Sequence, residues 1–231
     1  MSKRHYILLL TAFLWMFFSG QSLIAQHNKQ MFMFQIDGNN YEKKSYDKKG
    51  NLKSSQVFKV GTVKKEQEQY TMPLKVYAYD KHGKLKDSAK TEYTCKPSNH
   101  QVLMNVFPFA EYSANKTVKI ELNNGNEFYP ANWETGKYIQ EISFELTLEG
   151  GVLDAFGTSS KIKIYDRKIT TYDSVSNTYT ITAKMQIKAY MFGVRMDTIE
   201  YTIKETVHPQ KGIVTQYFRQ SNGEYFTIEL K

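Results

Sequence analysis

Apolar and polar residues alternate with a period of two along much of the chain, which predicts long β-strands. In the clearest case, apolar side chains take every second position from Tyr179 to Met191, with threonine, lysine and glutamine between most of them. This alternation indicates a strand with one buried side and one solvent-facing side. Similar runs span Val118–Leu122, Ile142–Leu148, Ile162–Ile169 and Ile199–Val207.

Short polar motifs between these runs predict tight hairpin turns. The segments Tyr46–Lys53 and Tyr79–Lys86 nearly repeat each other, and each has an aspartate followed three residues later by a glycine. Aspartate opens a turn by bonding its own backbone, and glycine takes the positive φ that a bulged turn needs. Gln220–Glu224 is predicted to close a third hairpin, and Gly193 suits a turn between two long strands.

Long strands joined by short turns predict an all-β protein with one or two short helices. The expected architecture is a single large curved antiparallel sheet, half-barrel or barrel-like, around one core. No proline-rich, glycine-rich or low-complexity linker interrupts the body. We therefore expect residues 27–231 to form a single antiparallel β domain.

One apolar stretch breaks the period-two pattern and predicts a short helix or a lid. It runs from Met104 to Ala114 and contains Pro108. If the sheet curls only partly shut, this stretch and the concave face enclose an apolar cleft, because methionine and aromatic side chains suit acyl chains. The alternative is that the stretch plugs the open end of the core. The candidate ligand-binding residues are Met104, Val106, Phe107, Phe109 and Tyr112.

The N-terminus has the order of a secretory signal peptide. Lys3 and Arg4 precede an apolar run from Tyr6 to Phe18, and small residues follow up to Ala25. The run is short for a membrane span, which needs roughly 20 residues, so cleavage near residue 26 is favoured over a retained anchor. Residues 1–26 are therefore predicted to be a signal peptide. The mature protein is expected in the periplasm, at the outer membrane or outside the cell.

The charge of the chain is basic but dispersed. Removing residues 1–26 takes away Lys3 and Arg4 and no acidic residue, so the formal net charge falls from +8 to +6. The lysines alternate with apolar residues, which is typical of a solvated sheet face, and we expect no nucleic-acid partner. Denser pairs such as Lys48–Lys49 can contact an anionic membrane surface peripherally.

Residues that carry catalysis or bind metals are sparse. Cys95 is the only cysteine, so it forms no internal disulfide, and it is expected to be a small buried apolar residue rather than a nucleophile. The five histidines lack the spacing of metal ligands. We therefore predict no metal, no cofactor and no catalytic residue; a hydrolase would require two convergent carboxylates or a paired nucleophile.

Four segments occur in an order that recurs in a family of exported bacterial proteins: Tyr46–Leu52, Glu127–Lys137, Asp166–Ile169 and Lys211–Tyr217. On these segments the chain resembles the TapB-like proteins, whose molecular function is unknown, over roughly Tyr46 to Lys231. That family is similar in fold to the LolA/LolB lipoprotein carriers, whose curved half-barrel holds acyl chains beneath a helical lid. The resemblance implies a LolA/LolB-like fold and carries over no functional residue.

Two functional interpretations follow. In the first, the chain is an exported, non-enzymatic envelope protein that binds a lipid, an acyl chain or an apolar partner in a concave β cleft. In the second, it is a structural protein of the envelope with a filled core, no small ligand and a defined protein partner. Enzymatic activity is not expected.

Overall fold

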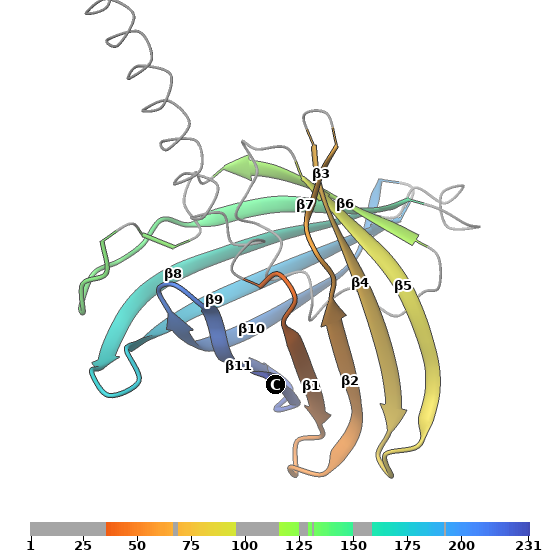
Figure 1. The fold of residues 1–231 in the computed structure, drawn as a ribbon, viewed down its shortest axis with the longest axis horizontal. Coiled ribbons are helices and arrows are strands. Elements are labelled where there is room, and N and C mark those ends of the chain that lie inside the picture. Colours follow the sequence, from red (N-terminus) through yellow and green to blue (C-terminus); the bar gives the residue numbers. More distant parts are fainter. Residues whose placement is uncertain are drawn as a thin grey trace, which may run out of the picture.

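Residues 36–66, 69–95, 116–124, 129–130, 132–149, 159–191 and 193–231 are described in the computed structural model. Within these ranges the protein is all β, with one twelve-stranded sheet and no helix, as Figure 1 shows. This confirms the predicted fold class, while the short helix or lid predicted at Met104–Ala114 lies outside the described residues. The strands are β1 (Asn40–Tyr46), β2 (Leu52–Val60), β3 (Lys64–Glu66), β4 (Gln69–Asp80), β5 (Leu85–Cys95), β6 (Lys116–Asn124), β7 (Ile142–Glu149), β8 (Ser159–Asp173), β9 (Thr178–Met191), β10 (Val194–His208), β11 (Gly212–Gln220) and β12 (Tyr225–Leu230).

The sheet curves strongly and has a barrel-like shape. Its strand order is β2-β1-β12-β11-β10-β9-β8-β7-β6-β5-β4-β3, and β2 also pairs with β4. This extra pairing places strands from the two ends of the order side by side. Figure 1 shows the result as two arms, one formed by β1, β2, β4 and β5 and the other by β8, β9 and β10.

The predicted hairpin turns are present. The Asp47 carboxylate accepts the backbone N–H groups of Lys49 and Asn51, and the Asp80 carboxylate does the same for His82 and Lys84. The glycine of each turn has the positive φ that the motif requires, as do Gly193 and Gly223. These turns explain why the two near-repeats in the sequence both form the tip of a hairpin.

The junction between β5 and β6 departs from the antiparallel pattern. These two strands pair in parallel, and only from Thr91 opposite Lys116 to Thr94 opposite Lys119. Parallel neighbours need a crossover of about a dozen residues or more, and residues 96–115 supply that length. The expectation of antiparallel pairing therefore fails at this one junction, because the apolar stretch that interrupts the strand pattern lies in the crossover.

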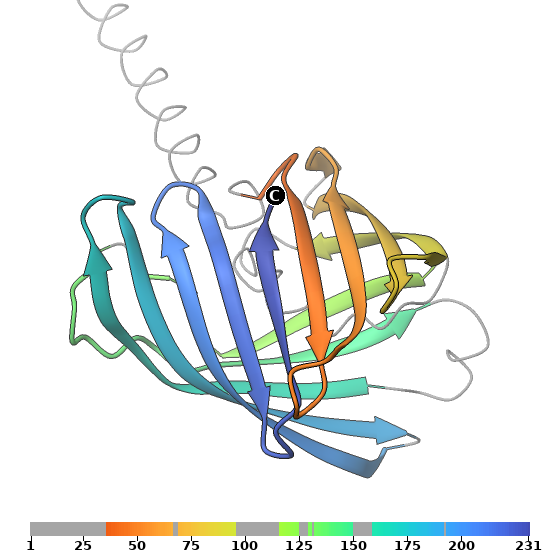
Figure 2. The same ribbon diagram turned by 90° about the horizontal axis from the view of Figure 1, so that it is seen from below.

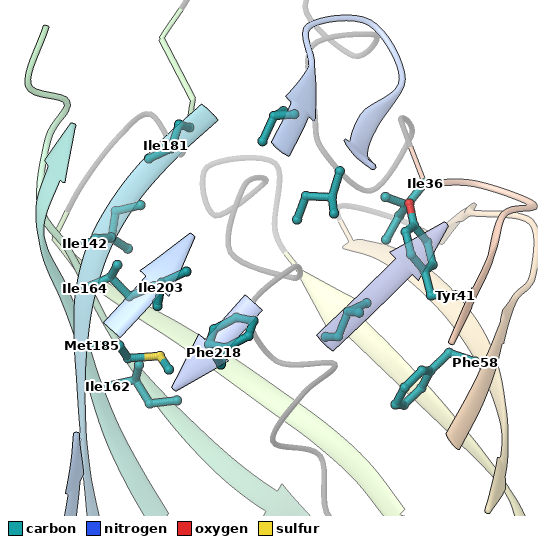
Figure 3. Close-up of a cluster of buried hydrophobic side chains, with 14 of the residues drawn as sticks. Ile36, Tyr41, Phe58, Ile142, Ile162, Ile164, Ile181, Met185, Ile203 and Phe218 are labelled. Atoms are coloured by element: carbon teal, nitrogen blue, oxygen red, sulfur yellow. The ribbon is translucent and has the colours of Figure 1, made fainter. Parts of the chain in front are cut away.

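The core lies on the inner face, which we define as the side of the curved sheet that carries the buried side chains. Alternate residues of β8 and β9 point to this face, as the period-two pattern predicted, and alternate residues of β4 do so as well. Figure 3 shows side chains from both arms directed into one interior, with Phe58 and Tyr41 on one side and Ile142, Ile164 and Met185 on the other.

In the described part of the chain, no helix has the length and apolar character needed to cross a membrane.

The β9–β10 hairpin extends beyond this core. The predicted inner face of β9 is buried from Ile181 to Ile187, but Met191 is exposed. The other strand of the hairpin, β10, pairs with β11 only from Tyr201 onward. Among the described strands, the first part of β10, Val194–Glu200, therefore pairs with β9 only. Figure 2 shows this end of the hairpin at the lower right. Sequence alternation alone would have continued the core to Met191.

Candidate functional site

Three polar side chains are buried in the inner face among the apolar residues. Arg167, Glu205 and Gln216 come from β8, β10 and β11, and none is more than 4 % exposed. Glu205 lies directly opposite Gln216 in the pairing of β10 with β11. We call these three residues, with Tyr129, the inner polar cluster.

The Glu205 carboxylate is the centre of the cluster. One of its oxygens accepts a hydrogen bond from Gln216 Nε2 at 2.8 Å, and the other accepts one from the Tyr129 hydroxyl at 3.1 Å. Arg167 contributes its positive charge to the same site and donates from Nη1 to the carbonyl oxygen of Gln140 at 2.8 Å. Such mutual hydrogen bonding offsets the cost of burying polar groups.

An irregularity in β8 turns Arg167 inward. The register between β8 and β9 shifts between Tyr165 and Lys168, and Asp166 has φ 52°, a left-handed conformation that is uncommon for residues other than glycine. The extra residue reverses the alternation, so Arg167 faces the core. Asp166 is left on the surface, where it forms an exposed ion pair with Lys184 at 2.9 Å.

A non-strand segment covers this part of the sheet. We call residues 129–130 and 132–141 the Trp133 segment. The segment precedes β7 and pairs with the same edge of β8. Gly136 N–H donates to the Ile169 carbonyl, and Ile139 N–H donates to the Arg167 carbonyl. Gly136 has φ +90°, which favours glycine at this turn.

Aromatic stacking fixes the Trp133 segment on the sheet. The Trp133 ring stacks on Tyr129 at 5.6 Å between centroids and on Tyr179 of β9 at 5.0 Å. Tyr179 in turn contacts Tyr172 of β8 at 4.6 Å. These contacts position the Tyr129 hydroxyl over Glu205, so the segment and the inner polar cluster form one unit.

Burial controls the protonation of the cluster. It raises the pKa of Glu205 above the ordinary glutamate value, and the charge of Arg167 and the two hydrogen bonds offset only part of this effect. Burial also lowers the pKa of Arg167. The pKa of the Tyr129 hydroxyl is raised, first by burial and then by the nearby Glu205 carboxylate.

The geometry of the inner polar cluster is that of a structural anchor. Both oxygens of Glu205 are occupied by partners from within the protein, and the carboxylate is buried. The cluster therefore joins β8, β10 and β11 to the Trp133 segment. Among the described residues, no group of three or more histidine, cysteine, aspartate or glutamate side chains is placed to hold a metal ion.

A second polar feature lies at the hairpin tips. A shallow hollow between the β1–β2 and β11–β12 turns is lined by polar side chains, and Lys53 of β2 pairs across it with Glu224 at 2.7 Å. Next to these turns in the sequence, the rings of the paired residues Tyr46 and Tyr225 stack at 4.7 Å between centroids. The hollow is lined by Asp47, Lys48, Lys49, Asn51, Asn222 and Glu224.

The candidate ligand-binding residues predicted from the sequence lie outside the described residues. This holds for Met104, Val106, Phe107, Phe109 and Tyr112, so their role stays a prediction. The inner polar cluster was not predicted as a site. A signal for Glu205 exists, because it occupies an inward position between Ile203 and Val207 in an alternating strand. Arg167 gives no such signal, since the β8 bulge that turns it inward is not visible in the alternation.

Three of the four segments that carry the resemblance to TapB-like proteins meet at this cluster. Glu127–Lys137 supplies Tyr129 and Trp133, Asp166–Ile169 supplies Arg167, and Lys211–Tyr217 supplies Gln216. Residues that are distant in the sequence are thus brought together by the pairing of neighbouring strands β8 to β11 and of the Trp133 segment with β8.

Comparison with known proteins places the chain in a fold and a family. A family profile described as DUF3108-like matches residues 36–217. A proposed exported protein of Bacteroides fragilis with a YmcC-like fold aligns with a TM-score of 0.50 and 16% identity, covering 84% of this chain and 96% of its own. A proposed lipoprotein of Parabacteroides distasonis aligns with a TM-score of 0.50 and 19% identity, covering 87% and 99%.

At these identities, the two structures show a shared fold only. No curated protein matches the chain. The finer resemblance to TapB-like and LolA/LolB proteins is not among these findings and stays a prediction.

Proposed function

We propose that this chain, which belongs to the DUF3108-like family, is an exported, non-enzymatic binding protein of the cell envelope. Its ligand is a lipid, an acyl chain or an apolar segment of a partner, held against the inner face of the curved sheet. The observation that carries this proposal is the mainly apolar lining, outside the inner polar cluster, that both arms of the sheet present to one interior.

Two observations support export. The first residues have the basic, apolar and small-residue order of a signal peptide. The two similar structures are described as an exported protein and a lipoprotein, each as a proposal. This chain has its single cysteine at position 95, far from the apolar run, so we propose that it is exported without a lipid on an N-terminal cysteine.

The character of the inner face supports an apolar ligand. Met72, Leu74 and Val76 of β4 face the interior from one arm, and Ile162 and Ile164 of β8 face it from the other. Flexible methionine and branched aliphatic side chains adapt to alkyl chains. The β5–β6 junction, where pairing covers only Thr91–Thr94 on β5, is the least extensively paired junction between the arms and is the proposed route of entry.

The state of the buried carboxylate supports a non-enzymatic role. A general acid or base needs access to its substrate. Glu205 is buried and hydrogen-bonded on both oxygens by Gln216 and Tyr129. We therefore assign this glutamate to the architecture of the binding fold rather than to chemistry.

Uptake of a lipophilic dye tests the proposal. We expect the purified protein to raise the fluorescence of a polarity-sensitive dye, and a long-chain fatty acid to displace that dye. Phe107→Asp, at a position predicted from the sequence to line the cleft, should weaken uptake, because a carboxylate in an apolar site is strongly disfavoured.

Val175→Asp is the matched control, since Val175 is 95% exposed at the β8–β9 turn. It should leave dye uptake unchanged. Equal uptake by Phe107→Asp and the parent protein, or no displacement by fatty acid, would count against an apolar ligand. It would favour the alternative of a filled core with a protein partner.

A further inference from the structure

The exposed end of the β9–β10 hairpin carries apolar side chains that the core does not use. Val194 is 63% exposed and Met196 is 62% exposed, and Met191 opposite Val194 is also exposed. We call residues 190–191 and 193–196 the hairpin tip. Solvent-facing hairpin ends are normally polar, so several exposed apolar side chains together indicate a surface that is covered by something.

Three cations lie at or near the hairpin tip, on the face of the strands opposite to Met191 and Val194, because successive residues of a strand point to opposite faces. Arg195 is directly opposite Tyr190 in the β9–β10 pairing, and Lys161 of β8 lies over the Tyr190 ring at 5.3 Å. Lys188 of β9 is directly opposite Lys161. Like charges at opposed positions are destabilising unless an anion neutralises them. Glu145 of β7 lies opposite Lys161 on its other side, but within the described residues no ion pair joins an acidic group to any of the three cations.

The unpaired edge of β10 near the tip is poorly suited to pair with a strand of another protein. The register of β10 shifts between Arg195 and Asp197, and such a bulge disrupts pairing along an edge. The Asp197 carboxylate also accepts the backbone N–H of Thr198 at 2.7 Å. An N–H that is already used in this way is not available to an incoming strand. The side chains of the tip are therefore what a partner would contact.

From these observations we infer that the hairpin tip docks on a phospholipid membrane that carries anionic headgroups. Met191, Val194 and Met196 enter the boundary between headgroups and acyl chains. Lys161, Lys188 and Arg195 stay at the level of the headgroup phosphates, with Tyr190 among them. Apolar insertion combined with nearby cations is the general requirement for peripheral binding to anionic membranes.

Vesicle flotation tests this inference on the full chain. We expect the protein to float with vesicles of phosphatidylethanolamine and phosphatidylglycerol, and much less with vesicles of phosphatidylcholine alone. Val194→Asp combined with Met196→Asp should abolish flotation with both. Val175→Asp, an exposed position on another turn, should not change it. All variants share the same N-terminus, so any contribution of residues 1–26 is common to them.

A charge comparison separates a specific site from general basicity. Replacing Lys161, Lys188 and Arg195 together by glutamine should weaken binding to the anionic vesicles by at least about tenfold. The matched control replaces Lys81, Lys84 and Lys211 by glutamine, which removes the same charge from exposed positions elsewhere on the sheet. The control should retain the affinity of the parent.

Three results would overturn the inference: no flotation of the parent protein, equal loss in both triple variants, or a tip variant that binds as the parent does. Because the readout is vesicle binding and not dye uptake, failure here leaves the proposed inner-face ligand untouched. Likewise, a failure of dye uptake leaves the inference about the hairpin tip untouched.

Discussion

The two ends of the β9–β10 hairpin have opposite surroundings. At its base, Ile181 and Glu205 lie opposite each other and are both buried, with β8 and β11 completing the sheet. At its tip, Val194 and Met196 are exposed, and β10 has no described neighbour on its outer side. The base thus holds charged groups where water is excluded, and the tip holds apolar groups where water is abundant.

Folded proteins usually bury apolar side chains and expose charged ones, and each end of the hairpin departs from this rule. The two ends differ in how the cost of that departure is offset. The base satisfies its buried charges internally, through Arg167, Gln216 and Tyr129. The tip has no internal compensation for its apolar side chains. We infer that the base serves stability and that the tip serves contact with another surface.

Removing the buried cation should have the largest effect on stability. Arg167→Met leaves the Glu205 carboxylate buried without its positive neighbour, which we expect to lower the free energy of unfolding by about 3 kcal/mol. Urea unfolding followed by tryptophan fluorescence measures it. Lys184→Met, which breaks the exposed pair with Asp166 next to Arg167, is the control and should shift the midpoint little. Similar losses in both variants would show that the inner polar cluster is not special.

Deleting the stacked tryptophan should have the next largest effect. Trp133→Ala removes the ring between Tyr129 and Tyr179, and we expect a loss of about 2 kcal/mol, because the side chain is only partly buried. Differential scanning calorimetry provides the measurement. Tyr138→Ala in the same segment is the matched control, since Tyr138 is exposed. An unchanged Trp133→Ala protein would mean that the Trp133 segment does not hold the cluster.

The raised pKa of Glu205 predicts a specific dependence on pH. Folded Glu205 keeps its proton to higher pH than unfolded Glu205, whose pKa is near 4.5. Its contribution to stability is therefore complete below that value and decreases as the pH rises through the folded-state pKa.

The measurement is the difference in unfolding free energy between the parent and Glu205→Gln across this pH range. We expect this difference to become less favourable to the parent as pH increases. Other titrating groups are shared and cancel. A difference that grows in favour of the parent with rising pH would mean that Arg167 outweighs burial.

The smallest change in stability is expected at the tip. Val194→Asp combined with Met196→Asp should alter the free energy of unfolding by no more than about 0.5 kcal/mol, because both side chains already face water. Thermal unfolding without vesicles checks this. A large loss would show that the tip is part of the packed structure, and the comparison between base and tip would fail.

Local sequence patterns were sufficient to predict several of the long strands and the hairpin turns. The alternation from Tyr179 to Met191 became β9, and the repeated aspartate–glycine motifs became the β1–β2 and β4–β5 turns. These features depend on neighbours within a few residues. The parallel β5–β6 junction was not predicted, because it depends on a long crossover.

The inner polar cluster shows where such patterns stop being informative. Glu205 breaks an apolar face and was visible in principle, but its partners come from β8, β11 and the Trp133 segment. Arg167 faces inward only because Asp166 adopts a positive φ within a bulge. The exposure of Met191 was also unpredictable, since it depends on where β11 ends relative to β10.

Native mass spectrometry of the protein freshly isolated from the cells that export it tests the proposed function most directly. The account predicts a population whose mass exceeds that of the polypeptide by the mass of one lipid or fatty acid, which is lost on extraction with organic solvent. Detection of the bare polypeptide alone, in a protein that also takes up no dye after delipidation, would contradict it.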